Sequence, residues 1–276
     1  MTQERFALDI GGRRFNVAVE DCHDLSIPLE FDGPQPSFFG APIASSTPLT
    51  AGDFTGDVRL GASCNCSTYS LTPHCTGTHT ECVGHITHDR LSVRDIAREA
   101  LIPAILLTVA LRTTATTHEQ SLPAPHPGDL LITRDELELA AQRHPVAGFR
   151  AVIVRTLPNS PDKQHRIYDT AHPPAYFSSD AMKWMVAHGI DHLVVDVPSV
   201  DRASDQGYLT AHRLFWGMPP ALTDALLATR AHATITELAY IDDAIDDGPY
   251  LLNLQVAPFA SDAAPSRPFL MRLLPQ

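Results

Sequence analysis

Short apolar runs along the chain predict most of its strands. Each run is rich in branched residues and bounded by turn residues, which is typical of buried strands. The predicted strands cover residues 104–111, 151–155, 192–197, 233–241, 250–256 and 269–274. The sequence Asp246-Asp247-Gly248 predicts a turn between the fourth and fifth of these runs.

Two segments between these runs have the pattern of amphipathic helices. Thr133 can cap the first helix, and Glu136 completes a capping-box pattern; the helix is expected to end before Pro145. The second helix is predicted over residues 179–188, with Gly189 as its stop. Together these elements predict an α/β fold with more strand than a simple βαβ alternation gives.

The first 73 residues have a different character. Residues 6–10 and 14–19 alternate on either side of Gly11-Gly12, which predicts a hairpin. Residues 21–73 are rich in Pro, Ser, Thr and Gly, so we expect mostly loop with short strands that wraps the core. Prolines are spread through the connections and no repeat appears. We therefore predict a single domain over residues 1–276.

Composition and charge exclude several classes of partner. Of the 276 residues, 44% are hydrophobic, and 32 acidic against 20 basic residues give a net charge of -12. This charge argues against nucleic acid and anionic membrane surfaces. The longest apolar runs are too short to span a bilayer, and residues 1–20 lack a basic start followed by an apolar stretch. We expect a cytoplasmic protein.

Cysteine and histidine are concentrated in one window. Five cysteines are an odd number and four fall within residues 64–82, which is a poor disulfide framework and favours reduced thiols. The chain has 14 histidines, and four of them lie within fifteen residues. These four are His74, His79, His85 and His88.

This window combines imidazole, thiol and carboxylate groups, which are the ligand types of zinc. Cys75, His79 and Glu81 can form three corners of a catalytic metal site that keeps one position for water. In an extended segment, His79 and Glu81 point the same way. If the preceding loop is shifted by one residue, His74 replaces Cys75 as the ligand.

Other interpretations of the window are less well supported. A structural zinc site made of Cys64, Cys66, Cys75 and Cys82 lacks the paired C-x-x-C spacing of zinc ribbons and fingers. Buried histidines and cysteines can also be ordinary core residues, but the density of the group favours metal. Neither a G-x-S-x-G elbow nor a glycine-rich phosphate loop is present.

The window resembles the hallmark H-x-G-T-H-x-D-x-x-x-H of the metal-dependent cyclase family, which includes bacterial kynurenine formamidase and isatin hydrolase. Residues 75–85 match it with Cys for the first His and Glu for Asp. Further matches follow in order between residues 71 and 272, whereas the first 70 residues match weakly. These matches are residues 151–156, residues 176–181, the D-x-P-S-x-D segment 196–201 and His212. They continue with Glu237, at the position of the glutamate in the family's E-N-L, and the P-x-R segment 265–267.

The resemblance implies a site with one or two metal ions. One metal is held by Cys75, His79 and Glu81, and Glu81 bridges to a second metal held by His212 and Glu237. His85 is implied as the general acid and base. Zinc is the expected ion and manganese also suits the site, while a thiolate at position 75 favours zinc. Such a centre lowers the pKa of bound water and polarises a carbonyl.

The resemblance also implies a fold and an activity. The fold is the family's α/β, cyclase-like (swivelling β/β/α) fold with a mixed β-barrel-like core and peripheral helices. The activity is metal-dependent hydrolysis of a carbon-nitrogen bond in an amide or cyclic amide, as in arylformamidase. Alternatives are a lactone or isatin-like ring hydrolase, and a non-catalytic member that binds a small ligand or zinc. Expected partners are a small-molecule substrate and further copies of the chain, as a homodimer or larger homo-oligomer.

Several residues near these motifs receive a structural interpretation. His88 and Asp89 are read as structural or supporting residues, and Asp196, Ser199 and Asp201 as scaffold, of which one can hold a metal ligand through a hydrogen bond. Phe38 and Phe39, before the motif, can stack on an aromatic substrate or fill the core. The sequence does not distinguish between these two roles.

Overall fold

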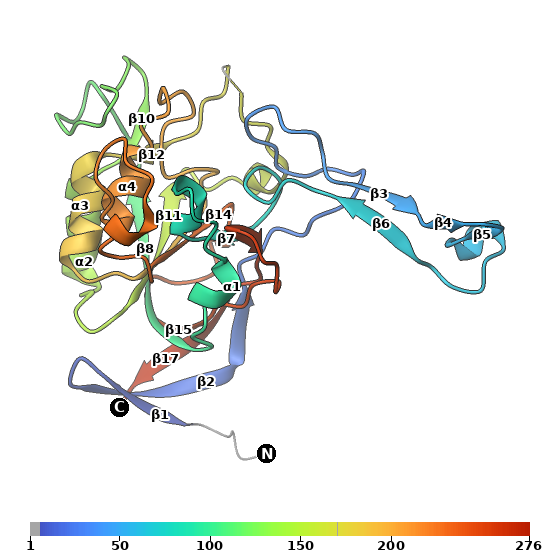
Figure 1. The fold of residues 1–276 in the computed structure, drawn as a ribbon. Helices are drawn as coiled ribbons and strands as arrows, with labels where there is room; N and C mark the ends of the chain where they lie inside the picture. The colour runs from blue at the N-terminus through green and yellow to red at the C-terminus, as the bar shows by residue number, and fades with distance from the viewer. Residues whose placement is uncertain (1–5, 170) are drawn as a thin grey trace.

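A computed structural model describes residues 6–169 and 171–276 of the chain (Figure 1). Two parts of the chain lie outside the described residues: Thr170, and residues 1–5 of the segment 1–20 discussed above. The described chain is a mixed α/β structure built on one large sheet, so the predicted class is confirmed. The boundary of a single domain at residues 1–276 stays a prediction.

One mixed sheet of ten strands forms the centre, in the order β1-β2-β17-β15-β8-β11-β13-β14-β7-β16. Strands β8, β11, β13 and β14 are parallel, and the other neighbouring pairs are antiparallel. All six apolar runs that predict strands lie in this sheet. The bounds are β1 Ala7–Ile10, β2 Arg13–Asp24, β7 His79–Glu81, β8 Ile102–Ala110, β11 Ala151–Leu157, β13 His192–Val195, β14 Thr234–Glu237, β15 Gly248–Asn253, β16 Ala263–Pro265 and β17 Phe269–Pro275.

The parallel strands are buried on both faces, which explains their uninterrupted apolar sequences. In β8, Ile105 and Leu107 belong to one apolar cluster, whereas Ala104 and Leu106 belong to another. This alternation follows from the period of two along a strand. The sheet therefore separates two layers of core.

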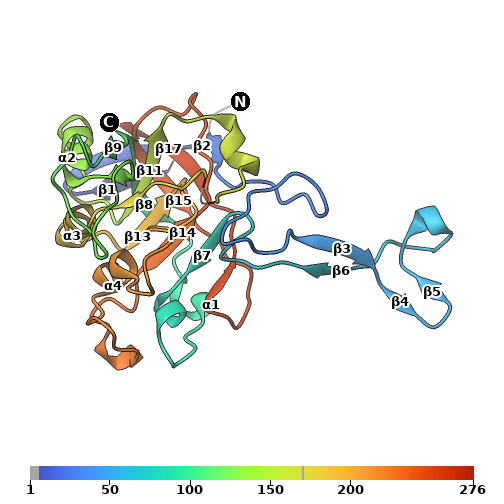
Figure 2. The ribbon, with the colours of Figure 1, turned by 90° about the horizontal axis from the view of Figure 1, so that it is seen from above.

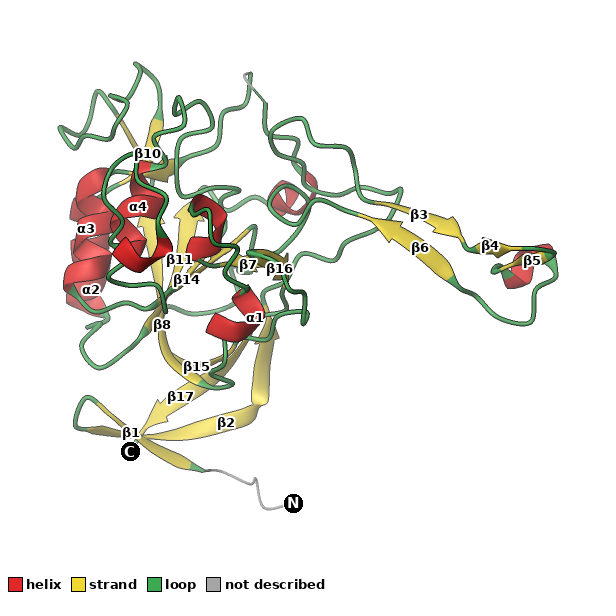
Figure 3. Ribbon diagram, viewed as in Figure 1, coloured by secondary structure: helices red, strands yellow, loops and turns green. Residues whose placement is uncertain are grey.

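Three helices cover one face of the sheet, side by side (Figure 3). They are α2 Arg134–Arg143, α3 Ser179–Ala187 and α4 Thr210–Trp216. The Thr133 hydroxyl accepts the Glu136 N–H at the start of α2, as the capping pattern predicts. Gly189, in the left-handed region with φ +69°, follows α3. Both predicted helices are thus confirmed, whereas α4 is an additional element that the sequence pattern did not predict.

Shorter elements complete the fold. The single turn α1 spans Val93–Ile96, and a small sheet contains β9 Arg112–Thr113, β10 Leu130–Ile132 and β12 Tyr176–Phe177. Turns of 3₁₀ helix span Val58–Leu60, Val83–Ile86, Pro161–His165 and Ala225–Leu227. Within residues 6–169 and 171–276, no helix has both the length and the apolar character needed to cross a membrane.

The N-terminal hairpin is confirmed, because β1 and β2 pair on either side of Gly11-Gly12. The expectation that residues 21–73 wrap the core is wrong in part. Strands β3 Ser45–Pro48 and β6 Ser67–Ser70 form an arm that projects away from the sheet, with β4 Thr50–Ala51 and β5 Phe54–Thr55 near its tip (Figures 1 and 2). None of the residues of these four strands is buried. The arm thus lacks an apolar face to bury on the core.

Candidate metal centre

The short strand β7 places the first candidate ligands. Because side chains alternate along a strand, His79 and Glu81 project from the same face. Glu237 of β14 stands directly opposite His79, and Ala263 of β16 stands opposite Glu81. Directly opposed residues of antiparallel strands share a face. The sheet register therefore brings Glu237 beside the motif across more than 150 positions of sequence.

Helix α4 places His212. The carboxylate of Asp201 accepts the backbone N–H groups of Ala211 and His212 at the start of this helix, at 2.8 and 3.1 Å. The same carboxylate accepts His212 Nδ1 at 2.6 Å. His212 Nε2 then lies 2.9 Å from Glu81 Oε1. Asp201 thus fixes both the helix start and the direction of the ring.

The turn before β7 and the turn after it place two more histidines. His74 Nδ1 lies 3.1 Å from Glu81 Oε2, and His74 Nε2 lies 2.8 Å from Asp262 Oδ2. His85, in the 3₁₀ turn Val83–Ile86, has Nδ1 3.5 Å from Asp262 Oδ2 and 3.9 Å from Glu81 Oε2. Its side chain is 28% exposed, so it can exchange protons with solvent.

Three of these histidines are held in the same way. In each ring, one nitrogen donates to an oxygen of fixed position and the other nitrogen faces a glutamate carboxylate. The direction of the first contact follows because a carbonyl or carboxylate oxygen only accepts hydrogen bonds. The fixed contacts are His74 Nε2 to Asp262 at 2.8 Å, His79 Nδ1 to the Gly77 carbonyl at 3.1 Å and His212 Nδ1 to Asp201 at 2.6 Å. This is the arrangement that orients imidazoles toward a metal.

Two buried atoms at the centre of this group have no hydrogen-bond partner: His79 Nε2 and Glu81 Oε2. The carboxylate oxygen Glu237 Oε2 lies 3.4 Å from His79 Nε2. Leaving such groups unpaired in the interior is costly. A cation bound between them would satisfy both, so the donor set fits a divalent metal.

The donor atoms of this centre form three overlapping groups, and within each group the atoms lie within 4.8 Å of one another. The groups are His74, His79 and Glu81; Glu81, His85 and His212; and His74, His85 and Asp262.

The carboxylates of this centre raise the pKa of two of its histidines. Burial alone would lower the pKa of His74, but the hydrogen-bonded carboxylate of Asp262 and the nearby carboxylate of Glu81 raise it to about 10. Burial would likewise lower the pKa of His212, yet the charges of Glu81 and Asp201 hold it well above its usual range. Burial alone would raise the pKa of Glu81, but the nearby imidazoles of His85 and His212 hold it well below its usual range. Metal binding must therefore displace protons from these rings.

Cys75 is buried beside this group but is not a member of it. In the described residues, none of the three donor groups includes its sulfur. Burial, followed by the negative charge of Glu237, raises the pKa of the Cys75 thiol. The structure brings together the other predicted site residues, His79, Glu81, His85, His212 and Glu237. His74, the alternative to Cys75, lies beside Glu81.

The sequence reading missed Asp262, which lies far from the motif and has no distinctive spacing. Its position just before the Pro265-Ser266-Arg267 segment was the available signal. Among the residues interpreted as scaffold, Asp201 supports His212, whereas Asp196 accepts Lys163 Nζ at 2.7 Å inside the core. His88 is exposed and belongs to none of the three donor groups.

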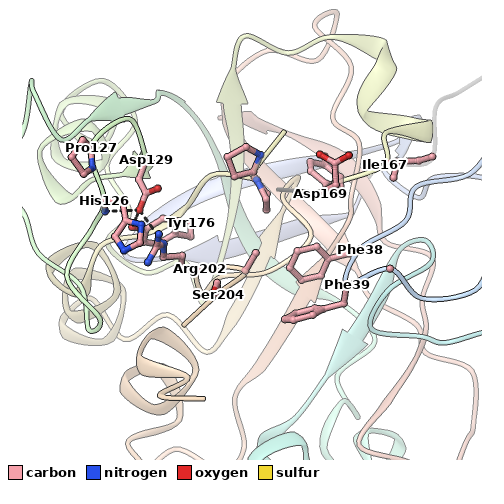
Figure 4. Close-up of a pocket in the computed structure, with 15 residues that line it drawn as sticks. Phe38, Phe39, His126, Pro127, Asp129, Ile167, Asp169, Tyr176, Arg202 and Ser204 are labelled. Carbon is pink, nitrogen blue, oxygen red and sulfur yellow. Dashed lines mark hydrogen bonds and ion pairs between the residues drawn. The ribbon is translucent and has the colours of Figure 1, made fainter. Parts of the chain in front are cut away.

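A cavity of about 610 Å³ is lined by residues outside the three donor groups (Figure 4). Phe38 and Phe39 line one side, with ring centroids 4.5 Å apart. On the other side, Asp129 Oδ2 accepts Tyr176 Oη at 2.7 Å and Arg202 Nε at 3.0 Å. Two backbone connections link the lining of the cavity to residues near the candidate centre: the Phe38 N–H donates to the Cys75 carbonyl at 3.1 Å, and Arg202 directly follows Asp201.

The sequence model of the family described as "Putative cyclase" matches residues 23–202, which is more than half of the chain. The chain belongs to the cyclase family. This result confirms the resemblance seen in the sequence, and the match includes His74, His79, Glu81 and His85 but stops before His212 and Glu237. No curated protein matches the sequence.

Solved structures of similar fold agree with this family. A predicted metal-dependent hydrolase from Bacillus stearothermophilus has a TM-score of 0.58 and 17% identity, covering 91% of this chain and 97% of its own. Isatin hydrolase A from Labrenzia aggregata has a TM-score of 0.58 and 15% identity, with coverage of 91% and 93%. Isatin hydrolase A from Ralstonia solanacearum has a TM-score of 0.55 and 17% identity, with coverage of 92% and 91%. At these identities the likeness shows the cyclase fold alone.

Proposed function

We propose that this chain is a metal-dependent hydrolase that cleaves a carbon-nitrogen bond in an amide or cyclic amide, as arylformamidase does. The observation that carries the proposal is the pair of unpartnered buried atoms, His79 Nε2 and Glu81 Oε2, inside a ring of oriented imidazoles. Membership of the cyclase family and the solved hydrolases of the same fold support it. The swivelling β/β/α fold with a β-barrel-like core belongs to the same proposal.

The residues divide into holders of metal and a proton carrier. His74, His79, Glu81, His212 and Glu237 would hold one or two zinc ions, with manganese as an alternative, and Glu81 can bridge because its two oxygens face different histidines. A bound metal supplies an acidified water and polarises the scissile carbonyl. His85 is placed to carry a proton to the leaving nitrogen, since its partly exposed ring lies at the edge of the cluster.

The cavity is the proposed place for the organic part of the substrate. Phe39 is 70% exposed and offers an aromatic ring on which an aryl group can stack, whereas Phe38 is buried behind it. The charge of Arg202 is paired with Asp129, so this wall offers hydrogen bonds more than a net charge. A small molecule with an aromatic ring next to its amide fits these walls.

A substrate panel tests the proposal. Protein loaded with zinc or manganese is assayed with an N-formyl arylamine, a five-membered aromatic lactam and an aromatic lactone, before and after treatment with a chelator. We expect metal-dependent cleavage of at least one carbon-nitrogen substrate. Cleavage of the lactone alone would support the lactonase alternative, and fully loaded protein that cleaves none would indicate a non-catalytic binding member. Light scattering of the same sample tests the proposed homodimer or larger homo-oligomer.

A further inference from the structure

The adjacent residues His74 and Cys75 are the two candidates for the metal ligand that corresponds to the first histidine of the cyclase motif. His74 Nδ1 lies 3.1 Å from Glu81 Oε2, and the His74 ring lies 5.4 Å from the His79 ring, measured between centroids. The neighbouring Cys75 belongs to none of the donor groups in the described chain. The turn that contains both residues explains the difference. The N–H groups of Cys75 and Thr76 both donate to the Thr72 carbonyl, at 3.0 and 3.1 Å. Successive side chains in such a turn point in different directions.

Asp262 is the residue that fixes the His74 ring. It stands immediately before β16, and its backbone carbonyl accepts the Cys82 N–H at 3.0 Å. This bond ties Asp262 to the chain directly after β7. Its Oδ2 atom lies 2.8 Å from His74 Nε2 and 3.5 Å from His85 Nδ1. One carboxylate thus contacts two imidazoles of the centre from the side away from Glu237.

The chemistry of this contact determines which nitrogen of His74 is free. A carboxylate accepts hydrogen bonds, so His74 Nε2 carries the proton that Asp262 binds. The Nδ1 atom, which faces Glu81, is then the nitrogen whose lone pair becomes available to a metal. His212 shows the same arrangement with the ring nitrogens exchanged, because Asp201 binds Nδ1 and Nε2 faces Glu81. The two aspartates therefore hold two imidazoles against the two oxygens of one glutamate.

We propose that Asp262 is a positioning residue that makes His74 a metal ligand in place of Cys75. Cys75 then remains a buried neutral thiol, and the centre contains only imidazole and carboxylate donors. Such a centre accepts harder ions than one with a thiolate. The inference rests on the metal centre of the proposed function but not on any hydrolytic activity.

Metal titration in the absence of substrate tests the inference. The affinity of metal-depleted protein for Co²⁺ and Zn²⁺ is measured by competition with a chromophoric chelator, for the parent chain and for Asp262→Asn, Asp262→Ala, His74→Ala and Cys75→Ser. Loss of an orienting partner typically weakens metal binding by about 10-fold to 100-fold. We expect Asp262→Ala to show a loss in this range, and Asp262→Asn a smaller loss because its amide oxygen still accepts a hydrogen bond. Cys75→Ser is expected to bind as the parent does.

A double variant separates positioning from a general structural effect. If Asp262 acts through His74, the variant that combines His74→Ala with Asp262→Ala binds metal no more weakly than His74→Ala alone. Asp246→Asn, which removes one exposed negative charge, is the matched control and leaves affinity unchanged. Additive losses in the double variant, or unchanged affinity in Asp262→Ala, would overturn the proposal.

The spectrum of the cobalt-loaded protein is an independent readout. A thiolate ligand gives cobalt an intense charge-transfer band in the near ultraviolet, so we expect the parent spectrum to lack this band. A band that disappears in Cys75→Ser would show that Cys75 is the ligand and would overturn the assignment of His74. These measurements are also independent of turnover. Protein that binds metal as described but cleaves no substrate would refute the proposed function and leave this inference standing.

Discussion

His212 Nδ1 lies 2.6 Å from Asp201 Oδ2, and this contact turns the opposite side of the ring toward Glu81. The same carboxylate accepts two backbone N–H groups at the start of α4. The side chain that begins the helix therefore also sets the direction of a candidate metal ligand. Local helix formation and site assembly are coupled at a single residue.

Asp201→Ala is expected to damage both functions of this carboxylate. Loss of an orienting partner should weaken metal binding by about 10-fold to 100-fold, and loss of the cap should destabilise the fold by about 1 kcal/mol. Chelator competition and chemical denaturation measure the two effects. Asp224→Ala is the control, because Asp224 caps only the 3₁₀ turn Ala225–Leu227, so it should affect stability without changing metal affinity. Equal metal affinities in both variants would contradict the role of Asp201.

His79→Ala should empty the site. His79 is buried, its free nitrogen lacks a partner, and no neighbouring imidazole occupies the same place opposite Glu237. Removing it leaves too few donors around the ion. Elemental analysis after dialysis should find little metal in this variant and normal metal in His88→Ala, which changes an exposed histidine nearby. Full occupancy in His79→Ala would argue against this centre.

His85→Ala should slow turnover and keep the metal. A positioned acid or base contributes about 100-fold to 10,000-fold to the rate, and the remaining histidines and glutamates can still hold the ion. The measurements are the turnover rate of the substrate found in the panel, the metal content and the recovery of rate by added imidazole. Loss of metal would instead indicate that His85 is a ligand. This outcome is a real alternative, because His85 Nδ1 lies only 3.5 Å from Asp262 Oδ2 at the edge of the cluster.

The part of the site that the sequence pattern predicts is the part that is local. His79 and Glu81 follow from the period of two along β7, whereas the role of His85 was implied by the family resemblance. His212 and Glu237 were reached only through the family register, because α4 is short and lacks a recognisable cap signal at Leu209. Asp262 was missed because its position before the P-x-R segment does not indicate its contact with His74, which depends on the pairing of β16 with β7.

The fold shows the same division between local and distant information. Buried strands and capped helices follow from local patterns, as in α2 with its Thr133 cap. The direction of the arm formed by β3 and β6 does not follow from a local pattern. The sequence of residues 21–73 predicts loop and short strands, but the direction in which the segment leaves the sheet depends on the pairing of β3 with β6. The expectation of a wrapping loop failed for this reason.

A buried histidine outside the centre should make stability fall at acidic pH. His192, at the start of β13, shares a hydrogen bond with Thr234 Oγ1 at 2.8 Å through Nδ1, while its Nε2 atom has no hydrogen-bond partner. Burial lowers its pKa from 6.5 to about 4; the charges of Glu99 and Asp191 oppose this shift, and those of Arg150 and His232 add to it. The folded protein therefore resists protonation of this ring.

The sign of the pH dependence follows from the two pKa values. Above pH 6.5 the ring is neutral in both states, and its contribution to stability is fully present. Between pH 6.5 and about 4 the unfolded chain binds a proton that the folded chain refuses, so stability falls, by on the order of 3 kcal/mol in total. Denaturant unfolding in a chelating buffer at several pH values should show a steeper fall for the parent chain than for His192→Asn. His118→Asn, at an exposed position, should follow the parent. Parallel curves for the parent and His192→Asn would mean that another group controls the acid sensitivity.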